Sequence, residues 1–209
     1  SPLWGPLLVP AQFVFFLALF NAYWLYKSAS LAIAALIGYR RLVAGQKEDW
    51  LGQVQEIEGW RRIRHLVLIP TYKEPPEILE VMLDHLAAQD FPRENVDVVL
   101  AFEERDLGAR ERATRLVEQF DGEFGHLWVT YHPDRPGELR GKSSNLAYAA
   151  RWAKRALVDE RGYDLRDVVV TVCDADSRLH AKFLSALTSK FLAEPARRYG
   201  IWQPALLFY

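Results

Sequence analysis

The sequence predicts an α/β fold: a mostly parallel sheet with flanking helices, preceded by an N-terminal transmembrane helix. Three observations support this prediction. The chain of 209 residues opens with a segment, residues 1–26, that carries no charged side chain. After residue 64, short apolar runs typical of strands alternate with longer runs whose apolar residues repeat at helical spacing. Strands that are apolar throughout indicate a sheet covered by helices on both faces.

The uncharged N-terminal segment is long enough to cross a bilayer. Between residues 7 and 26 only Pro10, Gln12 and Asn21 fall outside the apolar set. Twenty helical residues rise about 30 Å, the thickness of the hydrocarbon core. A signal peptide has a basic start, which is missing here, and a buried core helix is rarely so long. We therefore expect a transmembrane segment over residues 1–39.

Basic residues lie only on the C-terminal side of this segment. Lys27 is the first charge in the chain, and Arg40, Arg41 and Lys47 follow. By the positive-inside rule, the remainder of the chain lies on the cytoplasmic face of the inner (plasma) membrane. The lone cysteine, Cys173, excludes an intrachain disulfide and suits that reducing compartment.

The elements after this segment follow from the spacing of apolar residues. A polar stretch over 40–64 is expected to be a juxtamembrane connector, and the domain proper covers 65–209. Its strands are continuous apolar runs, and its helices have apolar residues every three or four positions. In order, we expect a strand over 66–69, a helix opening at Pro75 and Pro76, a strand over 96–102, a helix over 109–120, a strand over 127–131, a helix over 143–157, a strand over 168–173, a helix over 181–193 and a further strand within 201–209.

Polar clusters follow the predicted strands, at the edge where parallel sheets bind ligands. Thr71 and Glu74 suit a nucleoside, although Glu74 equally suits the positive end of the following helix. Either Glu103 or Glu104 suits a ribose or a base, and the sequence does not decide between them. The third cluster, Asp174 and Asp176, is the sharpest, and we expect all of them to converge on one edge of the sheet.

Asp174 and Asp176 follow a six-residue strand run. Two carboxylates one residue apart suit a hard cation such as Mg²⁺ or Mn²⁺, which keeps coordination positions for substrate phosphates. Turn formation and helix capping are the alternative uses of aspartate here. The position directly after a buried strand favours a metal–phosphate role.

Lys142 stands at the start of a predicted helix, after Gly141. A P-loop has four residues between its glycines, whereas Gly137 and Gly141 enclose three, so a P-loop ATPase is excluded. A lysine beside a helix N-terminus still suits a phosphate group. Lys142 is therefore a candidate phosphate-binding residue.

Three motifs in this order resemble the family-2 glycosyltransferases. They are Ile69-Pro70-Thr71-Tyr72-Lys73-Glu74-Pro75, Gly141-Lys142-Ser143-Ser144-Asn145-Leu146 and Asp174-Ala175-Asp176-Ser177. The resemblance is strongest to the membrane-bound, processive-type branch that includes cellulose and hyaluronan synthases. A segment similar to Ile201-Trp202-Gln203-Pro204 follows the metal site in that branch, and the resemblance covers residues 65–209.

The resemblance implies a GT-A fold that uses a nucleotide-diphosphate sugar, usually UDP-linked, with Mg²⁺ or Mn²⁺. It also implies inverting transfer of the sugar to a polysaccharide or lipid acceptor. By this resemblance Thr71 and Glu74 hold the nucleoside, Lys142 contacts the diphosphate, Asp174 contacts the nucleotide, and Asp176 binds the metal together with Asp174. The family usually has an aspartate after the second strand, where this chain offers Glu103 or Glu104 as the residue that reaches the nucleoside.

The catalytic base and the Gln-x-x-Arg-Trp acceptor motif of the family are expected beyond Tyr209. Arg151-Trp152 is not that motif, because Tyr148 stands where the glutamine belongs. The chain is thus expected to be the donor-binding half of a longer enzyme. Two alternatives stay open: a sugar-phosphate nucleotidyltransferase, and a non-catalytic membrane-tethered protein that binds a nucleotide. A net charge of −1 gives no basic field for nucleic acid.

Overall fold

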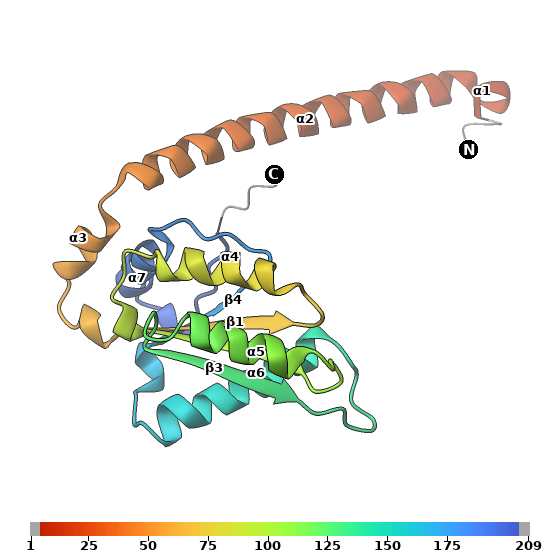
Figure 1. The fold of residues 1–209 in the computed structure, drawn as a ribbon. Coiled ribbons are helices and arrows are strands. Elements are labelled where there is room, and N and C mark those ends of the chain that lie inside the picture. Colours follow the sequence, from red (N-terminus) through yellow and green to blue (C-terminus); the bar gives the residue numbers. More distant parts are fainter. Residues whose placement is uncertain (1–4, 205–209) are drawn as a thin grey trace. The chain divides into compact units, whose positions relative to one another are not determined.

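The computed structural model describes residues 5–204, which form two compact units (Figure 1). One unit contains residues 5–48 and Pro204, and the other contains Asp49–Gln203. The further strand expected within 201–209 falls largely on residues 205–209, which lie outside the described part. Residues 201–204 form neither helix nor strand.

The first unit consists of α1 (Gly5–Leu8) and the long helix α2 (Pro10–Lys47). No side chain of α2 is buried. Among residues 5–204, no helix is both long enough and apolar enough to cross a bilayer. This finding corrects the transmembrane helix expected over 1–39. The physical reason is that Lys27, Ser28 and other polar residues in the middle of α2 lower its mean hydropathy.

The second unit begins before the sheet, with α3 (Trp50–Gln55) and the short 3₁₀ helix η1 (Trp60–Arg62). Val54 and Trp60 are buried in the same apolar core as the sheet. Residues 49–64, the larger part of the connector expected over 40–64, lie in the same compact unit as the sheet. Residues from 49 onward belong to the sheet unit because their apolar side chains complete its core.

The sheet has four parallel strands in the order β3-β2-β1-β4. The strands are β1 (Arg64–Thr71), β2 (Val96–Glu103), β3 (His126–His132) and β4 (Val168–Val172). Each contains or closely matches one of the four apolar runs predicted from the sequence. Register pairs Thr71 of β1 with Phe102 of β2, and Leu68 of β1 with Val172 of β4. The carboxyl ends of β1, β2 and β4 therefore share one edge.

Helices cover both faces of this sheet, as the apolar strands predicted. They are α4 (Pro76–Ala87), α5 (Ala109–Gln119), α6 (Lys142–Lys154) and α7 (Phe183–Ala193). On one face, residues of α4, α5 and α7 pack with Ile69 and Leu100 of the strands. On the other face, α6 packs Ala149 and Ala153 against Leu66 of β1.

Short helical segments complete the unit. They are the 3₁₀ helices η2 (Arg93–Asn95), η4 (Leu165–Asp167) and η5 (Arg197–Tyr199), and the π-helical turn η3 (Arg155–Asp159). The helix predicted over 143–157 is thus α6 continued by η3. Leu157 of this turn is buried against the same face of the sheet.

Candidate functional site

A pocket of about 370 Å³ opens at the carboxyl edge of the sheet. Its volume falls within the range of small-molecule sites. The pocket is lined by residues at or shortly after the ends of three strands and by the start of α6: Pro70, Thr71, Tyr72, Glu74, Ile78, Glu103, Lys142, Asn145, Asp174, Ala175 and Asp176. All six candidate residues from the sequence are among them. The structure thus brings the candidates together, and their roles remain predictions.

The turn after β1 is held by Glu74. The hydroxyl of Thr71 donates to the Glu74 carboxylate at 2.6 Å, and the backbone N–H of Tyr72 donates to the same oxygen. No side chain caps the start of α4. The carboxylate of Glu74 is therefore directed back to its own turn, at the wall of the pocket, rather than onto the free N–H groups of the helix.

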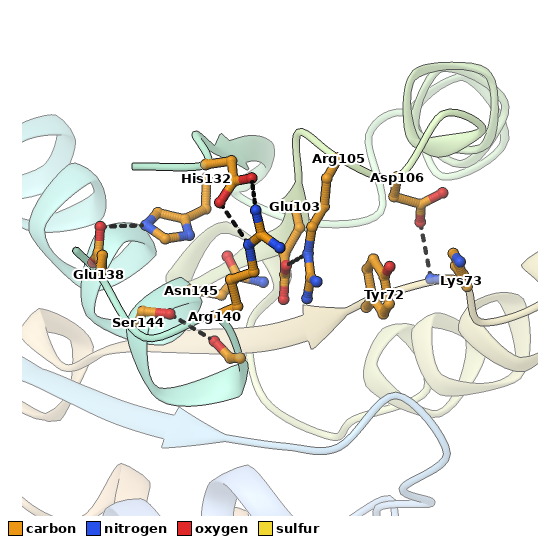
Figure 2. A network of polar contacts seen from close by, with 12 residues as sticks. Tyr72, Lys73, Glu103, Arg105, Asp106, His132, Glu138, Arg140, Ser144 and Asn145 are labelled. Carbon is orange, nitrogen blue, oxygen red and sulfur yellow. Dashed lines mark hydrogen bonds and ion pairs between the residues drawn. The ribbon is translucent and has the colours of Figure 1, made fainter. Parts of the chain in front are cut away.

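Glu103, and not Glu104, belongs to the pocket. Glu103 is the last residue of β2 and is buried, whereas Glu104 is exposed. The carboxylate of Glu103 accepts a hydrogen bond from Arg105, and this bond raises the pKa of the Arg105 guanidinium. The Arg105 guanidinium lies 4.3 Å from the centre of the Tyr72 ring, so this pair links the segments that follow β1 and β2 (Figure 2).

Lys142 is the first residue of α6, and Gly141 precedes it with a φ of 145°. Glycine adopts this conformation without steric cost, which allows the helix to begin at the pocket. The Lys142 ammonium donates to the carboxylate of Asp174, which follows β4. The ion pair places a cation and an anion side by side at the pocket.

Asp174 and Asp176 both expose their side chains, while Ala175 between them is buried in the core. In residues 5–204, no group of three or more His, Cys, Asp or Glu side chains could enclose a metal ion. Magnesium-type ions are commonly held by one or two carboxylates, with water and substrate phosphates as the other ligands. The two aspartates fit that incomplete type of site.

Cys173 separates β4 from these aspartates. Burial, together with the charge of Asp174, raises the pKa of the Cys173 thiol to about 12. The thiol therefore stays protonated near neutral pH and is a poor nucleophile or metal ligand. It acts as part of the core.

Asn145 lines the pocket but was not singled out from the sequence. Its amide nitrogen donates to the backbone oxygen of Ala101 at 2.6 Å, and the residue is buried. Its side-chain oxygen is buried without a partner among the described residues. The available signal was spacing: Asn145 lies one helical turn after Lys142, on the same side of α6.

Known proteins resemble the chain in sequence and in structure. The family model for "Glycosyltransferase like family 2" matches residues 64–203, more than half of the chain. No curated protein gives a significant match.

Among the solved structures that resemble the chain are the following two. One is mannosyltransferase PcManGT from Pyrobaculum calidifontis, in complex with GDP-Man and Mn²⁺, with 24% identity and a TM-score of 0.46; the match covers 82% of this chain and 43% of that chain. The other is S. aureus TarS 1–349, with 20% identity and a TM-score of 0.41, over 62% of this chain and 32% of that one. The chain spans less than half the length of these proteins.

Proposed function

Since the chain belongs to glycosyltransferase-like family 2, we propose that it binds a nucleotide-diphosphate sugar for transfer of the sugar to an acceptor. The observation that carries the proposal is the pocket, which gathers polar residues from three strand ends and one helix start. The proposed donor is a UDP-sugar, and the proposed acceptor is a polysaccharide or a lipid. Inversion at the anomeric carbon is part of the proposal and rests on the family resemblance.

In this proposal the nucleoside lies against the ends of β1 and β2. Thr71, Glu74 and Glu103 present hydroxyl and carboxylate oxygens there. Ribose hydroxyls and base N–H groups are hydrogen-bond donors, which such oxygens accept. Glu74 and Glu103 are each fixed by a hydrogen bond within the chain, so little side-chain entropy is lost when the nucleoside binds.

The diphosphate is assigned to Lys142. Its ammonium is a mobile cation at the N-terminus of a 13-residue helix, where unpaired backbone N–H groups add positive potential. Its partner in the chain is the exposed carboxylate of Asp174. We expect Lys142 to shift from this carboxylate to a phosphate oxygen when the donor binds.

A divalent cation, Mg²⁺ or Mn²⁺, is assigned to Asp176 together with Asp174. When bound, such a cation neutralises the negative charge that develops on the diphosphate leaving group. Asp176 is exposed at the pocket and forms no ion pair within residues 5–204. Its carboxylate is thus available as a ligand.

We also propose that the protein belongs to the processive, membrane-bound branch and is held at the cytoplasmic face of the inner membrane. The exposed apolar side chains of α2, such as Phe16, Phe20 and Trp24, support association with a lipid bilayer. Flotation with vesicles of phosphatidylethanolamine and phosphatidylglycerol tests this part. We expect the chain to float and a variant with serine at these three positions to stay behind; a chain that does not float contradicts the membrane proposal.

Calorimetric titration of the full chain with UDP tests the donor site. The titration is run with Mn²⁺, with a chelator, and with Asp176→Asn in the presence of Mn²⁺. We expect binding that needs Mn²⁺, is lost in Asp176→Asn, and persists in the control Asp159→Asn, whose carboxylate pairs with Lys154 beyond α6. If UDP binds equally well without metal, Asp176 is not a metal ligand of the donor site. A folded chain that binds no nucleotide contradicts the proposal.

A further inference from the structure

The turn after β1 contains a residue in an unfavourable backbone conformation. Lys73 has a φ of 65° and is the only residue other than glycine with a positive φ among residues 5–204. This region is costly for a residue with a Cβ atom, because that atom approaches the neighbouring carbonyl oxygen. Such a conformation persists where the surrounding structure holds it.

Asp106, in a neighbouring loop, accepts a hydrogen bond that holds this turn. The backbone N–H of Lys73 donates to Oδ2 of Asp106 at 2.9 Å (Figure 2). Asp106 lies in the loop after β2, 33 positions further along the chain. The contact joins the loops that follow two neighbouring strands.

The Asp106 carboxylate is itself rigidly placed. The residue is 5% exposed, and its carboxylate also accepts from the backbone N–H of Gly108 at 3.3 Å and from the guanidinium of Arg112. Its own backbone N–H donates to the carbonyl oxygen of Glu103 at 3.0 Å. A buried carboxylate with three donors is a fixed anchor for the turn.

The conformation of Lys73 sets the positions of its two neighbours. Tyr72 and Glu74 both line the pocket, whereas Lys73 and Asp106 are not among its lining residues. A rotation about the backbone at residue 73 turns Glu74 relative to Tyr72.

We propose that Asp106 is a positioning residue of the donor site. It holds Lys73 in the left-handed conformation and thereby places Tyr72 and Glu74 at the nucleoside end of the pocket. This inference rests on the proposed function of the pocket as a nucleotide-sugar site.

Rescue by glycine is the test, because glycine adopts a positive φ freely. Asp106→Ala is expected to weaken UDP binding in the presence of Mn²⁺ by about tenfold or more. Adding Lys73→Gly to Asp106→Ala is expected to restore most of that affinity. Adding Lys73→Ala, which also removes the ammonium but keeps a Cβ atom, is expected to restore none. If Asp106→Ala does not fold, Asp106→Asn takes its place in the same comparison.

A merely structural role makes a different prediction. Loss of Asp106 also leaves Arg112 unpaired, so the thermal unfolding midpoint falls and Lys73→Gly does not restore it. Recovery of UDP affinity without recovery of the midpoint therefore supports positioning. UDP binding by Asp106→Ala as tight as that of the original chain, or equal failure of both residue-73 variants to rescue, overturns the proposal.

Hydrogen exchange at the amide of residue 73 separates this inference from the proposed function. We expect slow exchange in the original chain and faster exchange in Asp106→Ala, whether or not nucleotide is present. Equal exchange in the two proteins overturns the role of Asp106. If the original chain does not bind UDP, the proposed function is overturned. The exchange rates at residue 73 then still test whether Asp106 holds the turn.

Discussion

Lys142 and Asp174 form an ion pair that links the start of α6 to the loop after β4, across 32 positions of sequence. The two side chains are 52% and 63% exposed. An ion pair so open to water adds little to stability, so little free energy is needed to separate the two groups. The arrangement keeps a cation at the pocket, as the proposed diphosphate site requires.

Replacement of Lys142 tests this assignment. We expect Lys142→Met to weaken UDP binding by about tenfold, because a charge-assisted hydrogen bond to a phosphate is lost. Binding of uridine, which has no phosphate, is expected to stay unchanged. Calorimetry with both ligands measures the difference, and Lys154→Met at the other end of α6 is the control. An equal loss for uridine and UDP contradicts a diphosphate role.

Asn145 is expected to contribute to the stability of the pocket wall. Asn145→Ala removes the hydrogen bond to Ala101 and leaves a buried carbonyl oxygen without its donor. We expect a loss of about 1 to 3 kcal/mol in the free energy of unfolding. Urea unfolding measures it, and Ser143→Ala, on an exposed position of the same turn, is the control. A loss no larger than that of the control argues against this hydrogen bond.

Stability is expected to depend on pH through His65. Burial lowers the pKa of His65 from 6.5 to about 3, and its Nε2 lies 2.7 Å from the Thr188 hydroxyl. Below pH 6.5 the unfolded chain binds a proton that the folded chain does not bind. The free energy of unfolding therefore falls as pH decreases from 6.5 towards 3, by up to about 1.4 kcal/mol per pH unit, and is unaffected by this group above 6.5.

His65→Gln isolates this contribution. We expect the decrease in unfolding free energy between about pH 7 and about pH 4.5 to be smaller in this variant than in the original chain. The control is His180→Gln, because His180 is exposed, and it should keep the original pH dependence. Urea unfolding at the two pH values gives both slopes. Parallel curves for all three proteins would contradict the assignment to His65.

The amino edge of the sheet carries a buried ion pair that we expect to be important for folding. Two nitrogens of Arg64 donate to the Asp97 carboxylate at 2.9 Å each, and Nδ1 of His126 lies 2.7 Å from it. Asp97→Ala is expected to cost about 3 to 5 kcal/mol, because it leaves a buried guanidinium without its partner. A double-mutant cycle with Arg64→Leu measures the coupling, and strictly additive losses contradict it.

Local sequence pattern predicts most of the sheet unit. Continuous apolar runs located all four strands. The central strands β1 and β2 are buried along their whole length, which gives the uninterrupted apolar pattern of a covered parallel sheet, whereas the edge strands β3 and β4 are only partly buried. Three groups of candidate residues stand at or shortly after the ends of strands, and parallel strand ends meet at one edge. For this reason the sequence alone predicts that Glu74, Glu103 and Asp176 lie close together.

Long-range contacts account for what the sequence did not reveal. Asp106 looks like a loop residue until it is seen to bind the amide of Lys73, and the partner of Asn145 is a backbone atom of a distant strand. The burial of Val54 and Trp60 also depends on where the chain returns to the sheet. The transmembrane helix expected over residues 1–39 was wrong because the prediction rested on the uncharged residues at its start. The helix α2 extends further and has polar residues in its middle, which lower its mean hydropathy.

Paramagnetic broadening by Mn²⁺ tests most directly whether the pocket is the donor site. The measurement compares backbone amide signals of the full chain with UDP and Mn²⁺ against those with UDP and Mg²⁺. We expect broadening centred on Asp174 and Asp176, extending to Thr71 and Lys142, with no effect at Asp164 on the opposite edge of the sheet. Broadening centred elsewhere in the chain, or equal broadening at Asp164 and Asp176, would contradict it.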